Sequence, residues 1–80
     1  MNKISEKMYE ALTLKYRTEI AEAEAILLVY FTSSVGIGEH PQHPEEMDMM
    51  VEKMTNAQDK LNSIHEFRKY NFNSMEENHK

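Results

Sequence analysis

The residues best suited to chemistry lie together in the segment SSVGIGEHPQHPEEMD, at positions 33–48, which holds both glycines, both prolines and two of the four histidines of the 80-residue chain. Four potential metal ligands fall close together there: Glu39, His40, His43 and Glu45. Imidazole with carboxylate is good ligand chemistry for zinc or another divalent ion. However, Pro41 separates the two histidines on a segment without helical spacing, so nothing fixes both imidazoles on one face. We therefore predict no metal site and expect solvated or helix-capping histidines.

The same segment suggests an anion site, because its two glycines could present successive backbone N–H groups to a phosphate. The carboxylates that follow would repel an anion, and the glycines are better explained by the positive φ that a helix end and a turn require. A small-ligand sponge, with signalling-nucleotide pockets between subunits, is therefore the alternative hypothesis for this chain. Its binding residues would be Lys15, Arg17, Gly36, Gly38 and His40.

Two acidic pairs offer a third chemistry. Glu19 and Glu22 form ExxE, and Glu45 and Asp48 form ExxD. The pattern resembles that of the all-α nucleoside triphosphate pyrophosphohydrolases of the MazG type, in which four carboxylates hold magnesium and water attacks the phosphate. In a hairpin bent near Gly38 the pairs would lie roughly 15 Å apart along the helices, too far to share one ion. No serine, threonine or lysine is paired with a base either, so we expect no enzyme, no catalytic residue and no cofactor.

Two long helices must position these groups. A stretch without glycine or proline, rich in Ala, Leu, Glu and Lys, predicts a first helix at about 5–33, which Ser5 or Asn2 could cap. Pro44 suits the first position of a second helix, predicted at about 44–70, whose first turn is acidic.

The remaining residues are predicted to form the loop and the tail of a single helical domain. Residues 34–43 form the predicted loop of the helical domain 1–70. Residues 71–80, NFNSMEENHK, are polar without a period, and we expect this tail to be disordered.

Each predicted helix carries an apolar stripe with steps of three and four residues. The first stripe is Tyr9, Leu12, Tyr16, Ile20, Ala23, Leu27 and Tyr30. The second has the spacing of a coiled-coil seam and consists of Met47, Met50, Met54, Ala57, Leu61 and Ile64. Arg68 interrupts it. The predicted fold is all-α, an antiparallel two-helix hairpin.

A hairpin of this size buries one stripe per helix and rarely forms a stable domain alone. Residues 26–31, ILLVYF, also leave the first helix without a polar face at its end, so that end must be covered on more than one side. We expect two hairpins to form a dimeric four-helix bundle. The predicted interface residues are Ile26, Leu28, Val29 and Phe31.

Composition excludes several classes of protein. The formal net charge is −5 and the basic residues are scattered, which does not suit binding to nucleic acid. Without cysteine there is no disulfide framework, and a reducing, intracellular setting is expected. The longest apolar run, residues 25–31, is far shorter than the roughly 20 residues of a membrane span. We expect a cytoplasmic protein with no membrane segment and no cleaved leader.

The stretch VYFTSSVGIGEHPQHPEEMD at 29–48, followed by AQDKL at 57–61, resembles a group of short uncharacterised proteins encoded by marine tailed phages. The GIGEHP element at 36–41 carries the resemblance. It implies a phage source and action in the cytoplasm of a bacterial host, and it implies no activity or site residue. The leading hypothesis is an oligomeric helical protein that acts by protein–protein binding, and the expected kind of partner is a host protein.

Overall fold

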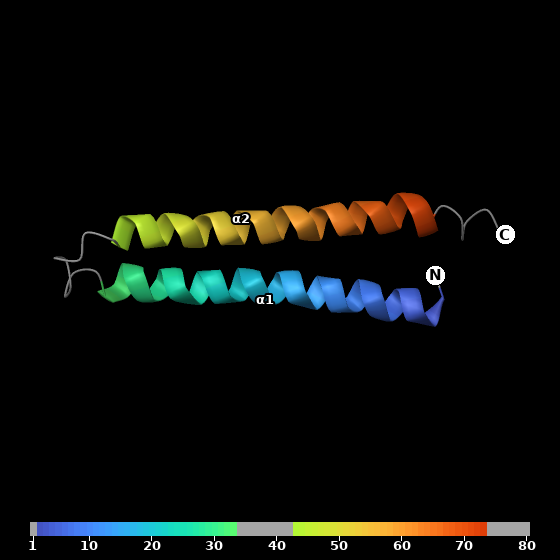
Figure 1. The fold of residues 1–80 in the computed structure, drawn as a ribbon, viewed down its shortest axis with the longest axis horizontal. Helices are drawn as coiled ribbons and strands as arrows, with labels where there is room; N and C mark the ends of the chain where they lie inside the picture. Colours follow the sequence, from blue (N-terminus) through green and yellow to red (C-terminus); the bar gives the residue numbers. More distant parts are fainter. Residues whose placement is uncertain (1, 34–42, 74–80) are drawn as a thin grey trace.

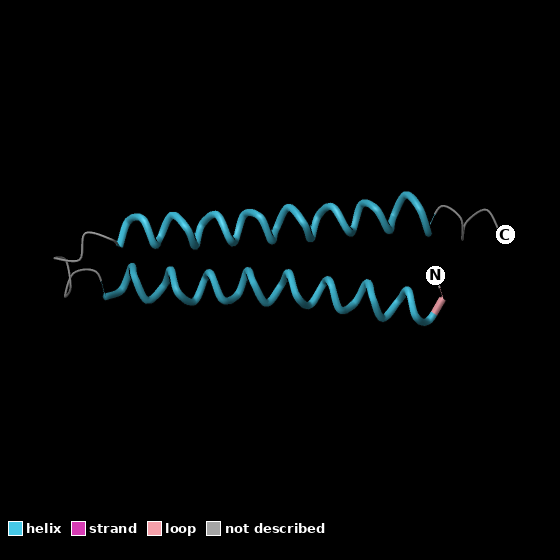
Figure 2. Tube along the Cα trace, in the orientation of Figure 1, coloured by secondary structure: helices cyan, strands magenta, loops and turns pink. Residues whose placement is uncertain are grey.

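The computed structural model describes residues 2–33 and 43–73, which form two antiparallel helices lying side by side (Figure 1). Helix α1 spans Lys3–Ser33 and helix α2 spans His43–Arg68, and a π-helical turn, η1, continues α2 over Lys69–Asn73. The described residues contain no strand (Figure 2). The predictions of an all-α fold and of two helices packed as a hairpin are confirmed.

Helix α1 begins two residues before the predicted position because Asn2 caps it. The Asn2 Oδ1 accepts a hydrogen bond from the Ser5 backbone N–H at 2.8 Å, and the Asn2 carbonyl accepts one from Glu6 N–H at 2.9 Å. The side-chain bond satisfies one of the donors that a helix start leaves without a partner. At the other end, the Thr32 hydroxyl donates to the Leu28 carbonyl at 2.7 Å.

The end of α2 corrects one prediction. Residues 71–73 were expected in the disordered tail, but they form part of η1. Two contacts explain the extra turn: the Asn71 amide donates to the Phe67 carbonyl at 2.9 Å, and the rings of Phe67 and Phe72 lie 6.2 Å apart. The predicted loop from residue 34 to 42, and the predicted tail from 74 to 80, lie outside the described residues.

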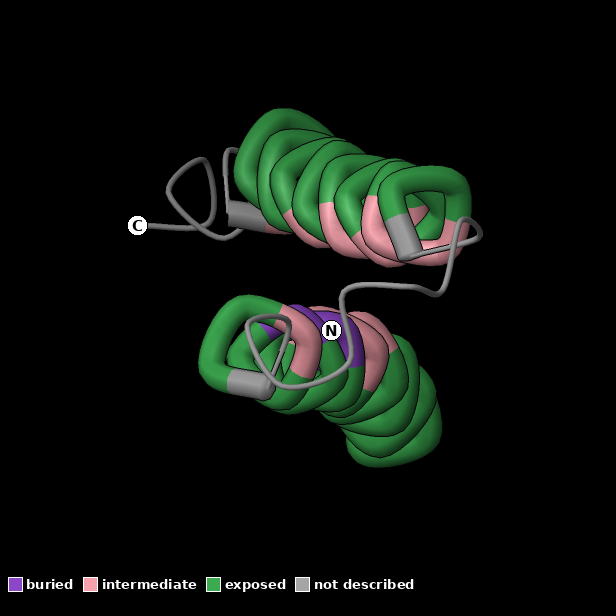
Figure 3. Tube along the Cα trace, turned by 90° about the vertical axis from the view of Figure 1, so that its left-hand side faces the viewer, coloured by how far each residue is buried: buried purple, intermediate pink, exposed green. Residues whose placement is uncertain are grey.

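The core is one narrow seam between the helices, seen end-on as the facing sides of the two tubes (Figure 3). Ala23 and Ala57 are its most buried residues, with 0% and 2% of their surface exposed. Both predicted stripes face this seam, except at Leu12, which is 36% exposed. Thr13 is buried in its place, because the step from Tyr9 to the next inward position is four residues and not three. No large side chain among the described residues is fully buried.

Polar contacts across the seam fix the level at which the helices meet. From the open end of the hairpin to the bend, the contacting pairs include Glu6 with Arg68, Tyr9 with His65, Tyr16 with Lys60, Glu22 with Lys53, and Tyr30 with Glu46. A residue of α1 is therefore level with a residue of α2 that lies equally far from the bend. For any further residue of α1, this register gives the residue of α2 that lies at the same level.

Candidate interaction surface

The end of α1 next to the bend exposes large apolar side chains. We call residues 26–31 the bend quarter. Ile26, Leu28, Val29 and Phe31, the predicted interface residues, are all classed as exposed in the single chain. Met49, on the facing end of α2, is exposed as well. An apolar surface on several sides of one helix end is unusual for a protein that works alone.

A second group of exposed apolar residues follows one side of the hairpin. We call this side the groove flank. It consists of Met8, Leu12, Glu19, Glu22 and Ile26 from α1 and of Met49, Lys53, Lys60 and Phe67 from α2. Steps of three, four and seven residues keep each set on one side of its helix. The groove flank therefore runs from the open end to the bend.

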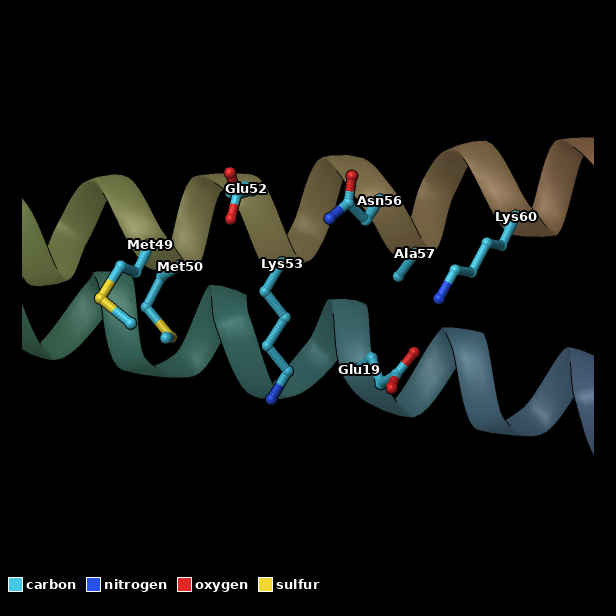
Figure 4. Close-up of a pocket in the computed structure, with 8 residues that line it drawn as sticks. All are labelled: Glu19, Met49, Met50, Glu52, Lys53, Asn56, Ala57 and Lys60. Carbon is cyan, nitrogen blue, oxygen red and sulfur yellow. The ribbon is translucent and has the colours of Figure 1, made fainter.

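Three shallow hollows lie along the groove flank. Near the bend, Ile26, Tyr30 and Met49 help to line one of about 210 Å³. In the centre, Glu19, Lys53 and Lys60 line one of about 350 Å³ together with Met49, which the two hollows share. Figure 4 shows Lys53 and Lys60 extending from α2 toward α1 on the side that carries Glu19.

The third hollow, of about 280 Å³, lies at the open end between Met8, Leu12, Ile64, Phe67 and Phe72. Its lining is almost entirely apolar. The groove flank is thus apolar at both ends and charged in the centre, where the Lys53 ammonium lies 3.1 Å from the Glu22 carboxylate. Both side chains of this ion pair remain partly exposed.

The other side of the hairpin holds a more polar hollow of about 290 Å³, lined in part by Glu6, Glu10, Thr13, Arg17 and Arg68. The Arg68 guanidinium lies 3.1 Å from Glu6 and 4.9 Å from the Tyr9 ring centre. The buried Thr13 hydroxyl has no hydrogen-bond partner among the described residues.

Of the five predicted ligand-binding residues, the structure describes Lys15 and Arg17. Lys15 and Arg17 are both exposed on α1. Residues two apart in a helix point about 200° apart, so the two basic side chains leave opposite sides of α1. Gly36, Gly38 and His40 lie outside the described residues.

The two acidic pairs are separated along the hairpin as the register predicts. Glu22 is level with Lys53, whereas Tyr30, near the bend, is level with Glu46 beside the second pair. Within residues 2–33 and 43–73 no three His, Asp or Glu side chains come together as a metal site would need. Glu39, His40 and the His43 side chain lie outside what the structure describes.

Sequence reasoning missed the groove flank. It treated Leu12 as a core residue and did not consider Met8, Met49 or Phe67 as surface. A signal was present, because Met8 lies beside the first predicted stripe, four residues before Leu12, and Lys60 and Phe67 lie seven residues apart beside the second stripe.

Comparison with family models, with curated proteins and with solved structures finds no match to this chain. Neither described helix contains a stretch long and apolar enough to cross a membrane.

Proposed function

We propose that this chain is a non-enzymatic, self-associating helical protein that acts by binding another protein. Two hairpins form a four-helix bundle. The exposed side chains of Ile26, Leu28, Val29 and Phe31 are divided between the contact with the second copy and the contact with the bound protein. The resemblance of the GIGEHP stretch to marine phage proteins supports a phage origin and action in the cytoplasm of a host cell.

One observation carries the proposal. The most buried residues of the single hairpin are alanines, while most of the large apolar side chains of the bend quarter are exposed. Burial of apolar surface is the main force that holds small folds together. A single hairpin leaves much of its apolar surface exposed to water, and a second copy would bury part of that surface.

The test is the mass of the purified, untagged protein in solution, with two variants as matched probes. We expect wild type to be an even-numbered oligomer at the bare protein mass. Ile26→Gln with Val29→Gln should dissociate it, because polar amides in a dry contact lose their hydration. Leu14→Gln alters an equally exposed position of α1 away from the bend and should leave the mass unchanged. A monomeric wild type at micromolar concentration would contradict the proposal.

A small-ligand sponge is the second candidate, and the hollow shared by Arg17 and Arg68 favours it. Glu6 and Glu10 line the same hollow and oppose an anionic ligand there. A panel of signalling nucleotides separates the two candidates, because a ligand that binds only the folded state raises the melting temperature. The binding-protein proposal predicts no shift.

A further inference from the structure

We infer that the groove flank is the surface on which a second copy of this chain docks, with both hairpin bends at the same end of the dimer. This inference rests on the proposed function and adds to it the face, the register and the orientation of the partner.

The size of the groove flank supports its assignment as the contact between two copies. From Met8 to Ile26 on α1, and from Met49 to Phe67 on α2, the groove flank is about 27 Å long at 1.5 Å per residue, and it is about 20 Å wide, two helix diameters. A contact of roughly 540 Å² per partner results, about 1,100 Å² in total, which is just above the minimum size of a specific protein interface. The contact would cover the hollows at both ends of the flank.

Two orientations of the second copy are possible, and the apolar ends of the flank are covered in both of them. Two hairpins can face each other with α1 over the second copy's α2 and the bends together, or with α1 over the reversed α1 and the bends apart. With the bends together, residues at the same level meet. Met8 then lies opposite Phe67 of the second copy, and Ile26 opposite Met49, so apolar groups cover apolar groups.

Charge complementarity selects the orientation with the bends together. With the bends together, Glu22 lies between Lys53 of its own chain, 3.1 Å away, and Lys53 of the second copy. The two carboxylates and two ammonium groups alternate around the centre of the bundle, so each charge has opposite neighbours. With the bends apart, Lys53 would instead face Lys60 of the second copy, and two like charges would be brought together.

The proposed contact covers only part of the bend quarter. Ile26 lies on the groove flank, whereas Leu28 is two helix positions away and leaves α1 on a different side. Leu28 therefore stays outside this contact and remains available to a different protein.

The first experiment mixes two chains. In Glu22→Lys with Lys53→Glu the charges are exchanged, so the variant should form its own dimer while each single variant, Glu22→Lys or Lys53→Glu, weakens self-association. Mixed with isotope-labelled wild type, the double variant should give far fewer mixed dimers than the statistical proportion in native mass spectrometry, because every contact between the two chains at this level would pair like charges. Mixed dimers at the statistical proportion would overturn the proposed orientation.

A second measurement does not depend on charge. The chain has no cysteine, so Thr32→Cys gives one label per copy near the bend. Helix axes in a bundle lie about 8–10 Å apart, so bends at the same end predict a spin-label distance below about 30 Å. Bends at opposite ends predict about 40 Å or more, the length of the helices. A dimer with the longer distance would overturn the orientation alone, whereas a monomeric wild type would overturn the proposed function itself.

Discussion

Ala23 and Ala57 are almost completely buried at the centre of the hairpin, whereas Leu28 and Val29, near the bend, are 64% and 61% exposed. Small side chains at the centre let the helices approach closely, but they bury little apolar surface. Large side chains at the bend would bury much more, but a single hairpin gives them nothing to pack against. The centre therefore sets the geometry of the hairpin. The bend quarter indicates that the hairpin gains stability by packing against another protein chain.

The largest effect should come from a charge at the centre. Ala57→Asp places a carboxylate in the seam without a partner, and we expect it to cost at least about 3 kcal/mol in the free energy of unfolding. Thermal unfolding followed by circular dichroism measures the loss. Gln58→Asp is the matched control, because residue 58 is exposed on the same helix, and it should change stability by less than about 0.5 kcal/mol. Equal losses in both variants would show that the seam is not the core.

The neighbouring residues Ile26 and Leu27 allow a direct comparison of an exposed side chain of the bend quarter with a buried side chain of the seam. Leu27 is buried in the seam, so Leu27→Ala should cost about 2–4 kcal/mol. Ile26 is partly exposed in one hairpin and lies on the groove flank, so Ile26→Ala should cost less and should lower stability mainly by weakening association. Unfolding at several protein concentrations separates the two effects, because stability that comes from association depends on concentration. An Ile26→Ala loss that is independent of concentration would place that side chain within one chain's own core.

A smaller effect is expected from the hydrogen bond near the bend, which the Tyr30 hydroxyl donates to the Glu46 carboxylate. Tyr30→Phe keeps the ring and removes the donor, so we expect a loss of about 1.5–3 kcal/mol, typical of a hydrogen bond to a charged group. Chemical denaturation measures it. The same variant combined with Glu46→Gln should lose little more than Tyr30→Phe alone, and full additivity would argue against the contact.

The smallest effect should come from the open end. Glu6→Gln removes the negative partner of Arg68, whose ion pair is partly exposed, and we expect a loss below about 1 kcal/mol that shrinks in high salt. Glu10→Gln, which affects the more exposed pair with Lys7, is the control. A salt-independent loss at Glu6 would mean that the Arg68 contact matters through packing and not through charge.

The fold was largely predictable because both helices carry regular stripes, and because Asn2 and Pro44 mark the two helix starts. The exchange of Leu12 for Thr13 in the seam was not predictable from hydrophobicity, since the register of the two helices, and not the polarity of a threonine, decides which residue faces inward. The turn at residues 71–73 depends on a contact between Phe67 and Phe72 that a local reading of a polar tail does not reveal.

The candidate surface was predicted in part. An apolar run such as residues 26–31 is visible in the sequence, whereas the groove flank combines positions from two helices and becomes visible only when the register across the seam is known. The predicted ligand site is a separate case, because Lys15 and Arg17 leave opposite sides of α1 and the other three residues of that site lie outside the described residues. Residues close together in sequence share a site only when their spacing matches the period of the element that carries them.

We propose that a second copy of the chain covers exposed apolar side chains of the hairpin. Native mass spectrometry of untagged protein, purified gently from cells, tests it most directly, because one spectrum gives both the number of subunits and the mass of any retained ligand. We predict an even-numbered oligomer, a dimer first of all, at the bare protein mass. A monomer, or a reproducible extra mass the size of a nucleotide, would contradict the account.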